Sequence, residues 1–131
     1  MNRPTPSGVD DAVLASVREA LDDHRRTWSS VLGDGGLVDA HVKELCARFL
    51  AEDDDVVAHA DDPERYDERE RAAMAWAQTI GWNPDAADEA LWRRLHAHFT
   101  DPELVELGTF ISLTLGQRNW LRTFGRAAER L

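Results

Sequence analysis

Cys46 is the only cysteine of the chain, and two residues that could support acid/base chemistry precede it closely. His41 and Glu44 are three positions apart, so they share a face if this stretch is helical. One hypothesis makes Cys46 a peroxide-reactive thiol that works beside Glu44 or His41. The alternative is an inert cysteine in the core, because free cysteine is among the residue types most often buried. Glu44 would then form an ordinary i,i+4 ion pair with Arg48.

The cysteine content restricts redox chemistry. With Cys46 alone, the chain has no intramolecular disulfide, no CxxC pair and no cysteine-rich zinc site. A peroxidase cycle needs a thiolate that attacks peroxide and a resolving thiol that restores it. The sequence therefore excludes a two-cysteine peroxidase and leaves only a one-cysteine enzyme that an external thiol resolves.

Charge and length set further limits. The formal net charge is -10 over 131 residues, which argues against binding to nucleic acid or to an anionic membrane surface. The acidic run at 52–55 lacks the alternating ligand pattern of a calcium loop, so we expect no metal site and no cofactor. Residues 1–8 are expected to be a flexible N-terminus without a signal peptide, and residues 9–131 a single cytoplasmic domain.

The hydrophobic pattern predicts an all-α protein with five main helices and one short helix. No stretch alternates with period two for long enough to be a convincing strand. Capping boxes begin two of the helices, at Asp67 with Glu70 and at Thr100 with Glu103. The main helices are predicted over residues 9–32, 37–51, 67–80, 83–99 and 100–124, and the short one over 56–59. The inner stripe of the second helix is predicted to comprise Val38, Val42, Leu45 and Phe49.

The stretch 100–124 is predicted to be the central element of the fold. No charged residue occurs from Leu107 to Gly116, which is typical of a helix surrounded by protein. The run is too short to cross a membrane, which takes roughly 18 apolar residues. Gly108, Ser112 and Gly116 stand four apart and predict a strip of small side chains against which another helix packs closely.

Three segments of the chain carry a resemblance to a known superfamily. They are LVDAHVKELCARFLAE (37–52), DERERAAMAWAQTI (67–80) and LHAHFTDPELVELGTFISLTLGQRNWLRTFG (95–125). In these segments the chain resembles the carboxymuconolactone decarboxylase and alkylhydroperoxidase D superfamily. The resemblance implies an alkylhydroperoxidase D-like helical bundle that assembles into a homo-oligomer.

The same resemblance implies which site residues are present and which are missing. In the hydroperoxidase branch a CxxC dithiol is served by an upstream glutamate, and Glu44 matches that glutamate. The two cysteines would then fall near Val56 and His59, and neither is cysteine here. In the decarboxylase branch a histidine serves the lactone acid, and His59 lies where that histidine could be. The resemblance thus implies the architecture without the dithiol cycle.

Two hypotheses of function follow. The favoured one is a divergent superfamily member without the redox dithiol, which serves as a non-peroxidase binding or structural oligomer. The alternative is a non-redox acid/base enzyme, decarboxylase- or isomerase-like, that acts on a small organic acid or lactone through Glu44 and His59. Five tryptophans and four phenylalanines are more aromatic surface than a helical core of this size easily hides. We therefore expect a homodimer or homotrimer held through the helices of residues 67–124.

Overall fold

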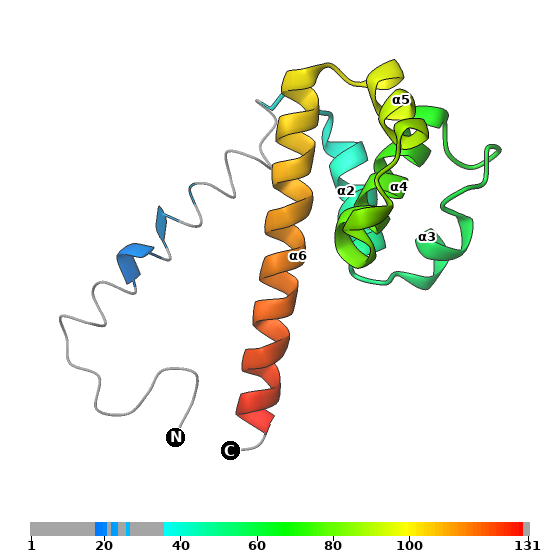
Figure 1. Cartoon of the computed structure of the whole chain (residues 1–131). Coiled ribbons are helices and arrows are strands. Elements are labelled where there is room, and N and C mark those ends of the chain that lie inside the picture. The colour runs from blue at the N-terminus through cyan, green and yellow to red at the C-terminus, as the bar shows by residue number, and fades with distance from the viewer. Residues whose placement is uncertain (1–17, 21, 24–25, 27–35, 130–131) are drawn as a thin grey trace.

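The computed structural model describes residues 36–129 of the chain, together with residues 18–20, 22–23 and 26 (Figure 1). Side chains are described as far as residue 123. Within these residues helices are the only regular elements, so the all-α prediction is confirmed for them. The flexible N-terminus expected for residues 1–8 and most of the helix expected for 9–32 lie outside the described residues. None of the described helices combines the length and apolar character that crossing a bilayer requires.

Helix α2, Ala40–Leu50, is shorter than the helix expected over 37–51. It begins after Asp39, whose carboxylate accepts a hydrogen bond from the backbone N–H of Val42 at 3.3 Å. The backbone N–H groups of Leu37 and Val38 are bound by Glu106, a residue of another helix, and so lie outside α2. The buried stripe predicted for this segment is confirmed, with all four residues at most 5% exposed.

The acidic run at 52–55 starts helix α3, Asp54–His59, which is the short helix that the sequence predicted near 56–59. Glu52 adopts a positive φ of 59° where the chain leaves α2. Asp53 then caps α3 by accepting hydrogen bonds from the backbone N–H groups of Asp55 and Val56. Among the described residues no group of three or more potential ligands could hold a metal ion.

Helix α4, Glu68–Trp82, begins with the capping box predicted at Asp67 and Glu70, and both of its hydrogen bonds are present. The single helix expected over 83–99 is wrong at its start. A one-turn 3-10 helix, η1 (Pro84–Ala86), is followed by extended backbone at Ala87. Helix α5, Glu89–His98, starts only after Asp88, whose carboxylate caps the backbone N–H of Leu91 at 2.9 Å.

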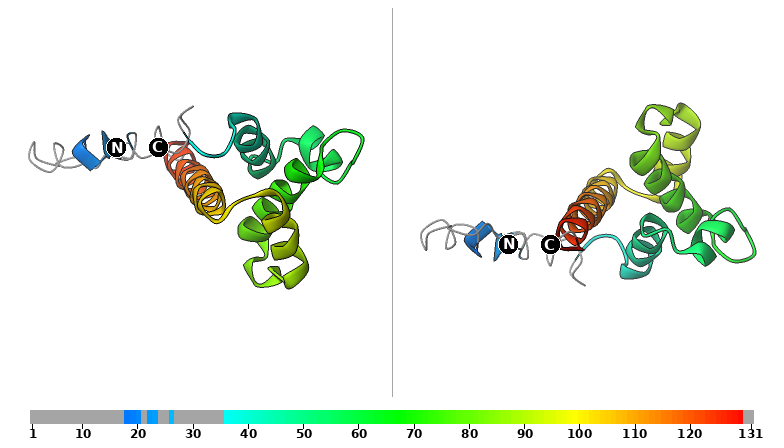
Figure 2. Two further views of the ribbon diagram at one scale, coloured as in Figure 1. Left: turned by 90° about the horizontal axis from the view of Figure 1, so that it is seen from above. Right: turned by 90° about the horizontal axis from the view of Figure 1, so that it is seen from below.

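Helix α6, Asp101–Glu129, is five residues longer at its C-terminal end than predicted. The predicted capping box is present, because Thr100 and Glu103 exchange their two hydrogen bonds. The first half of α6 packs on α2 and α4, Arg118 still reaches Glu52 at the end of α2, and the C-terminal end of α6 extends beyond them (Figure 1). Seen nearly along its axis, α6 has α2, α3, α4 and α5 all on one side (Figure 2).

The core lies between α2, α4, α5 and the first half of α6. The buried residues of α6 are Leu104, Leu107, Phe110 and Ile111, all at most 7% exposed. The prediction that protein surrounds residues 107–116 is wrong for one face of the helix. Ser112 and Gly116 are exposed, and no atom lies within 4 Å of a Cβ placed on Gly116. Gly108 is the member of the small-residue strip that meets a neighbouring helix closely, since a Cβ placed there would lie 2.9 Å from the Trp76 ring.

Candidate functional site

Cys46 lies on the buried face of α2 and is 0% exposed. Burial raises the pKa of its thiol to about 12, because the thiolate would be deprived of water. At neutral pH the thiol is therefore protonated, and peroxide cannot reach it from solvent without the core opening. These are the properties of a structural cysteine rather than a nucleophile.

Glu44 and His59 lie on different helices, and the structure gives each of them local partners. Glu44 is exposed on α2. It adds to the raised pKa of Arg48, whose main cause is a hydrogen bond to Asp53. His59 is half-exposed on α3, and its Nδ1 donates to the carbonyl oxygen of Asp55 at 2.8 Å. A role of either side chain in catalysis stays a prediction.

His41 binds a residue of α4 rather than the thiol that the sequence hypothesis paired with it. Its Nε2 donates to Glu70 Oε2 at 2.7 Å and so connects α2 to the first turn of α4. The side chain of Glu70 also belongs to the capping box of α4 through its other oxygen. His41 therefore contributes to helix packing at this corner of the fold.

A buried ion pair between Lys43 and Glu106 is a charged site that the sequence did not predict. Lys43 is 1% exposed, and its Nζ lies 3.1 Å from Glu106 Oε2. The carboxylate of Glu106 also accepts hydrogen bonds from the backbone N–H groups of Leu37 and Val38, at 3.0 and 2.7 Å. A Cβ on Gly36 would lie 2.8 Å from both charged side chains, so any larger residue there would displace one of them. The pair holds the residues that precede α2 against α6.

The pKa of Glu106 reflects two opposing effects. Partial burial acts to raise the pKa, since a charged carboxylate loses water. The hydrogen bonds from Val38, Leu37 and Lys43, together with the positive charge of Lys43, outweigh burial and hold the pKa below its usual value. Three further carboxylates have lowered pKa values for the same kind of reason. The main donors are Arg48 for Asp53, Arg94 for Glu68 and the backbone N–H of Thr100 for Glu103.

Acidification is therefore expected to destabilise the fold. A carboxyl group whose pKa is lowered on folding stabilises the protein fully above the pKa of the unfolded chain, about 4 to 4.5. This contribution is lost as the pH falls through the lower pKa of the folded state. The midpoint of thermal unfolding should be nearly constant from pH 7 to pH 5 and then fall steeply below pH of about 4.5. Glu103→Gln should flatten that fall, whereas the exposed Glu89→Gln should leave it unchanged. If the unfolding midpoint falls equally steeply with pH in both variants, Glu103 does not contribute to the loss of stability in acid.

A hollow lined by aromatic side chains lies between α4, α5 and α6. Its volume is about 670 Å³. The rings of Trp76 and Trp92 meet edge to face in its wall, with centroids 5.8 Å apart. His96 lies beside Trp92 and contacts its carbonyl oxygen through Nδ1 and the Asp101 carboxylate through Nε2. We call this the aromatic hollow; on α6 it is lined by Asp101, Leu104, Val105, Gly108, Thr109, Ser112 and Leu113.

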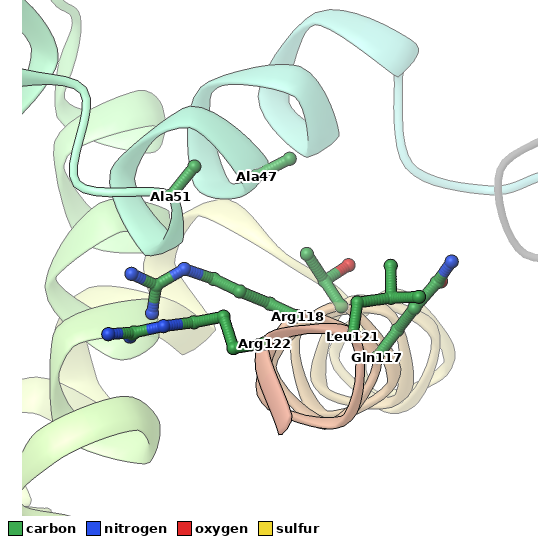
Figure 3. A pocket seen from close by; sticks show the side chains of 7 residues that line it. Ala47, Ala51, Gln117, Arg118, Leu121 and Arg122 are labelled. Atoms are coloured by element: carbon green, nitrogen blue, oxygen red, sulfur yellow. The ribbon is translucent and has the colours of Figure 1, made fainter. Parts of the chain in front are cut away.

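A second hollow, of about 480 Å³, lies between the end of α2 and the second half of α6 (Figure 3). Ala47 and Ala51 form one wall, and the side chains of Arg118 and Arg122 extend in the same direction from the other. Arg118 is already engaged, because its Nη2 donates to Glu52 Oε2 at 2.6 Å. Arg118 therefore connects α6 to the end of α2.

Glu44, Cys46 and His59 line neither of these hollows. The aromatic hollow was not predicted because its residues come from three helices that are distant in sequence. Its one sequence signal was the number of tryptophans, which pointed equally to core or subunit contact. No protein-family model, curated protein or solved structure matches this chain.

Proposed function

We propose that this protein is a divergent member of the carboxymuconolactone decarboxylase and alkylhydroperoxidase D superfamily that performs no thiol chemistry and works as a homo-oligomer with a binding or structural role. The observation that carries the proposal is the complete burial of Cys46, the only cysteine of the chain. A peroxidatic thiol has to meet peroxide as a thiolate. The Cys46 thiol has a pKa of about 12, so it is not a thiolate at neutral pH, and its burial in the core keeps peroxide away from it.

The helical architecture supports the superfamily assignment. Each of the three segments that carry the resemblance contains or begins a helix, namely α2, α4 and α6. These three helices pack against one another, although α2 and α6 are distant in sequence. An alkylhydroperoxidase D-like bundle would place the same segments together.

Exposed apolar side chains support the oligomer. Among the described side chains of a single chain, seven large hydrophobic residues are at least 40% exposed. Trp92 and Val105 both line the aromatic hollow, and exposed apolar side chains that lie together commonly mark contact with a partner, most often a second copy of the same chain. The seven residues are Leu37, Val57, Trp82, Trp92, Val105, Trp120 and Leu121. The alternative of an acid/base enzyme has no comparable support, because Glu44 and His59 line neither hollow.

The test of this function is peroxide turnover combined with thiol accessibility. The protein supplied with a dithiol reductant should consume no peroxide above background, and Cys46→Ser should behave identically. An aromatic disulfide reagent should modify Cys46 slowly in the native protein and rapidly in denaturant. The matched control is Cys46→Ser/Ala51→Cys, which moves the thiol to the exposed end of α2 and should react at once. Robust turnover that disappears in Cys46→Ser would instead establish a one-cysteine peroxidase.

A further inference from the structure

From Val105 to residue 123, the face of α6 that points away from α2 carries no charge. Between Leu104 and residue 123 the charged residues are Glu106, Arg118 and Arg122. Glu106 binds Lys43, and Arg118 binds Glu52, so both point toward α2, and Arg122 lines the same hollow as Arg118. We call the opposite side the outer face; its residues are all exposed and comprise Val105, Thr109, Ser112, Gly116, Asn119 and Trp120.

An uncharged strip of this length is unusual for such an acidic chain. At about 1.5 Å per residue, the outer face from Val105 to Trp120 extends about 22 Å. A partner of opposite charge would be recognised through acidic side chains, and the outer face has none. A second copy also carries a net charge of -10 and is repelled wherever charged faces meet. Contact along the outer face keeps the remaining charges apart, where salt screens them over about 8–10 Å. The charge pattern therefore favours a second copy as the occupant.

The residue spacing along α6 is symmetric about Ser112. Gly108 and Gly116 lie four residues before and after it, and Leu104 and Trp120 lie eight residues before and after it. If two α6 helices cross antiparallel with a two-fold axis beside Ser112, each Gly116 lies beside the partner's Gly108. Each Trp120 then lies at the level of the partner's Leu104. Ridges formed by residues four apart pack in this way at a crossing angle of about −50°.

The aromatic hollow of one copy lies at the level where the two-fold axis places the partner's Trp120. Leu104 lines the hollow, together with Trp76 and Trp92. In a single chain Trp120 is 49% exposed and Trp92 is 40% exposed, so both rings have apolar surface to bury. Aromatic rings gain further stability in edge-to-face contacts, of the kind that Trp76 and Trp92 already make.

We propose that two copies of this chain associate through the outer faces of their α6 helices, with a two-fold axis beside Ser112, and that Trp120 of each copy fills the aromatic hollow of the other. The inference rests on the oligomer part of the proposed function and adds the partner and the contact. Because the contact is isologous, every interaction occurs twice. It is compatible with a dimer or with a larger assembly built from such pairs.

The first test compares substitutions of three exposed residues of α6. Trp120→Ser removes the inserted ring, and Gly116→Leu adds bulk where the single chain has open space but the partner's helix would lie. Each should weaken self-association about 10-fold or more, measured by sedimentation over a micromolar concentration range. Leu121→Ser is the matched control, since Leu121 is 50% exposed but lines the hollow toward α2. It should associate like the unmodified chain.

The second test uses a disulfide across the axis. Ser112→Cys should form an intermolecular disulfide under mild oxidation, since a two-fold axis beside residue 112 brings the two α-carbons within the roughly 7 Å that a disulfide requires. Asn119→Cys is the control: its two copies would lie about 21 Å apart along the helices and should not link. Buried Cys46 does not compete in either variant.

The outcomes distinguish the proposed contact between α6 helices from self-association through another surface. If the protein associates but Trp120→Ser and Gly116→Leu match the Leu121 control, and Ser112→Cys links no faster than Asn119→Cys, the proposed contact is wrong and the oligomer stands. If the unmodified chain is a monomer near 14.8 kDa at micromolar concentration, the proposed function fails and the contact with it.

Discussion

Replacing Lys43 with methionine is expected to lower the free energy of unfolding by about 3–5 kcal/mol. The ammonium group is almost completely buried, and its carboxylate partner Glu106 is only 16% exposed. Removal of one member leaves the other charge in a poorly solvated site. Glu106→Gln is expected to have an effect of similar size, because the amide keeps the shape and a hydrogen-bonding oxygen but removes the negative charge that offsets the buried ammonium. Unfolding in urea at pH 7 measures both.

A double-variant cycle distinguishes the ion pair from simple loss of packing. Lys43→Met combined with Glu106→Gln should cost clearly less than the sum of the two single changes, since both charges are then removed together. The exposed pair Arg93–Glu89, with 79% and 94% exposed side chains at 3.7 Å, is the control. Neutralising either of its members should change stability by less than about 1 kcal/mol. If Lys43→Met lowers the free energy of unfolding no more than Arg93→Met does, the buried pair contributes no more to stability than an exposed pair.

Helix positions could be predicted from the sequence where the signal is local. The capping boxes at Asp67 and Thr100 involve residues three apart, so their sequence alone indicates where α4 and α6 begin. The apolar stripe of α2 is likewise a property of one helix. The start of α5 shows the limit of this approach. The sequence predicted a helix from residue 83, but Asp88 is the residue whose carboxylate binds the N-terminus of α5.

Contacts between distant segments were not predictable in the same way. Lys43 and Glu106 are 63 positions apart. Each stands out in the sequence only once the structure shows that the two side chains meet. Lys43 lies three and seven positions before the buried Cys46 and Leu50 and so on the same side of α2, and Glu106 is the last acidic residue before the uncharged run of α6. The aromatic hollow similarly requires α4, α5 and α6 to be in place. Of the candidate site, burial of Cys46 followed from its position beside the stripe of α2, while catalytic roles of Glu44 and His59 stay predictions.

The prediction with the next largest effect compares two glycines of α6. Gly108→Leu is expected to destabilise the fold by about 1–3 kcal/mol or more through overpacking. The Cβ alone would lie 2.9 Å from the Trp76 ring, before the rest of the side chain is considered. Trp76 is 9% exposed and packs edge to face on Trp92, so the ring cannot shift without disturbing that contact.

Gly116→Leu is expected to stabilise the fold instead. No atom lies within 4 Å of a Cβ at this position in the single chain, and leucine is favoured over glycine in a helix by up to about 1 kcal/mol. The two variants should be compared by denaturant unfolding in dilute protein, so that self-association does not contribute. The same substitution, eight residues apart in one helix, should thus lower stability at Gly108 and raise it at Gly116. Equal losses at both sites would mean that the α6 face around Gly116 is covered even in the single chain, and the outer face would then be unavailable to a second copy.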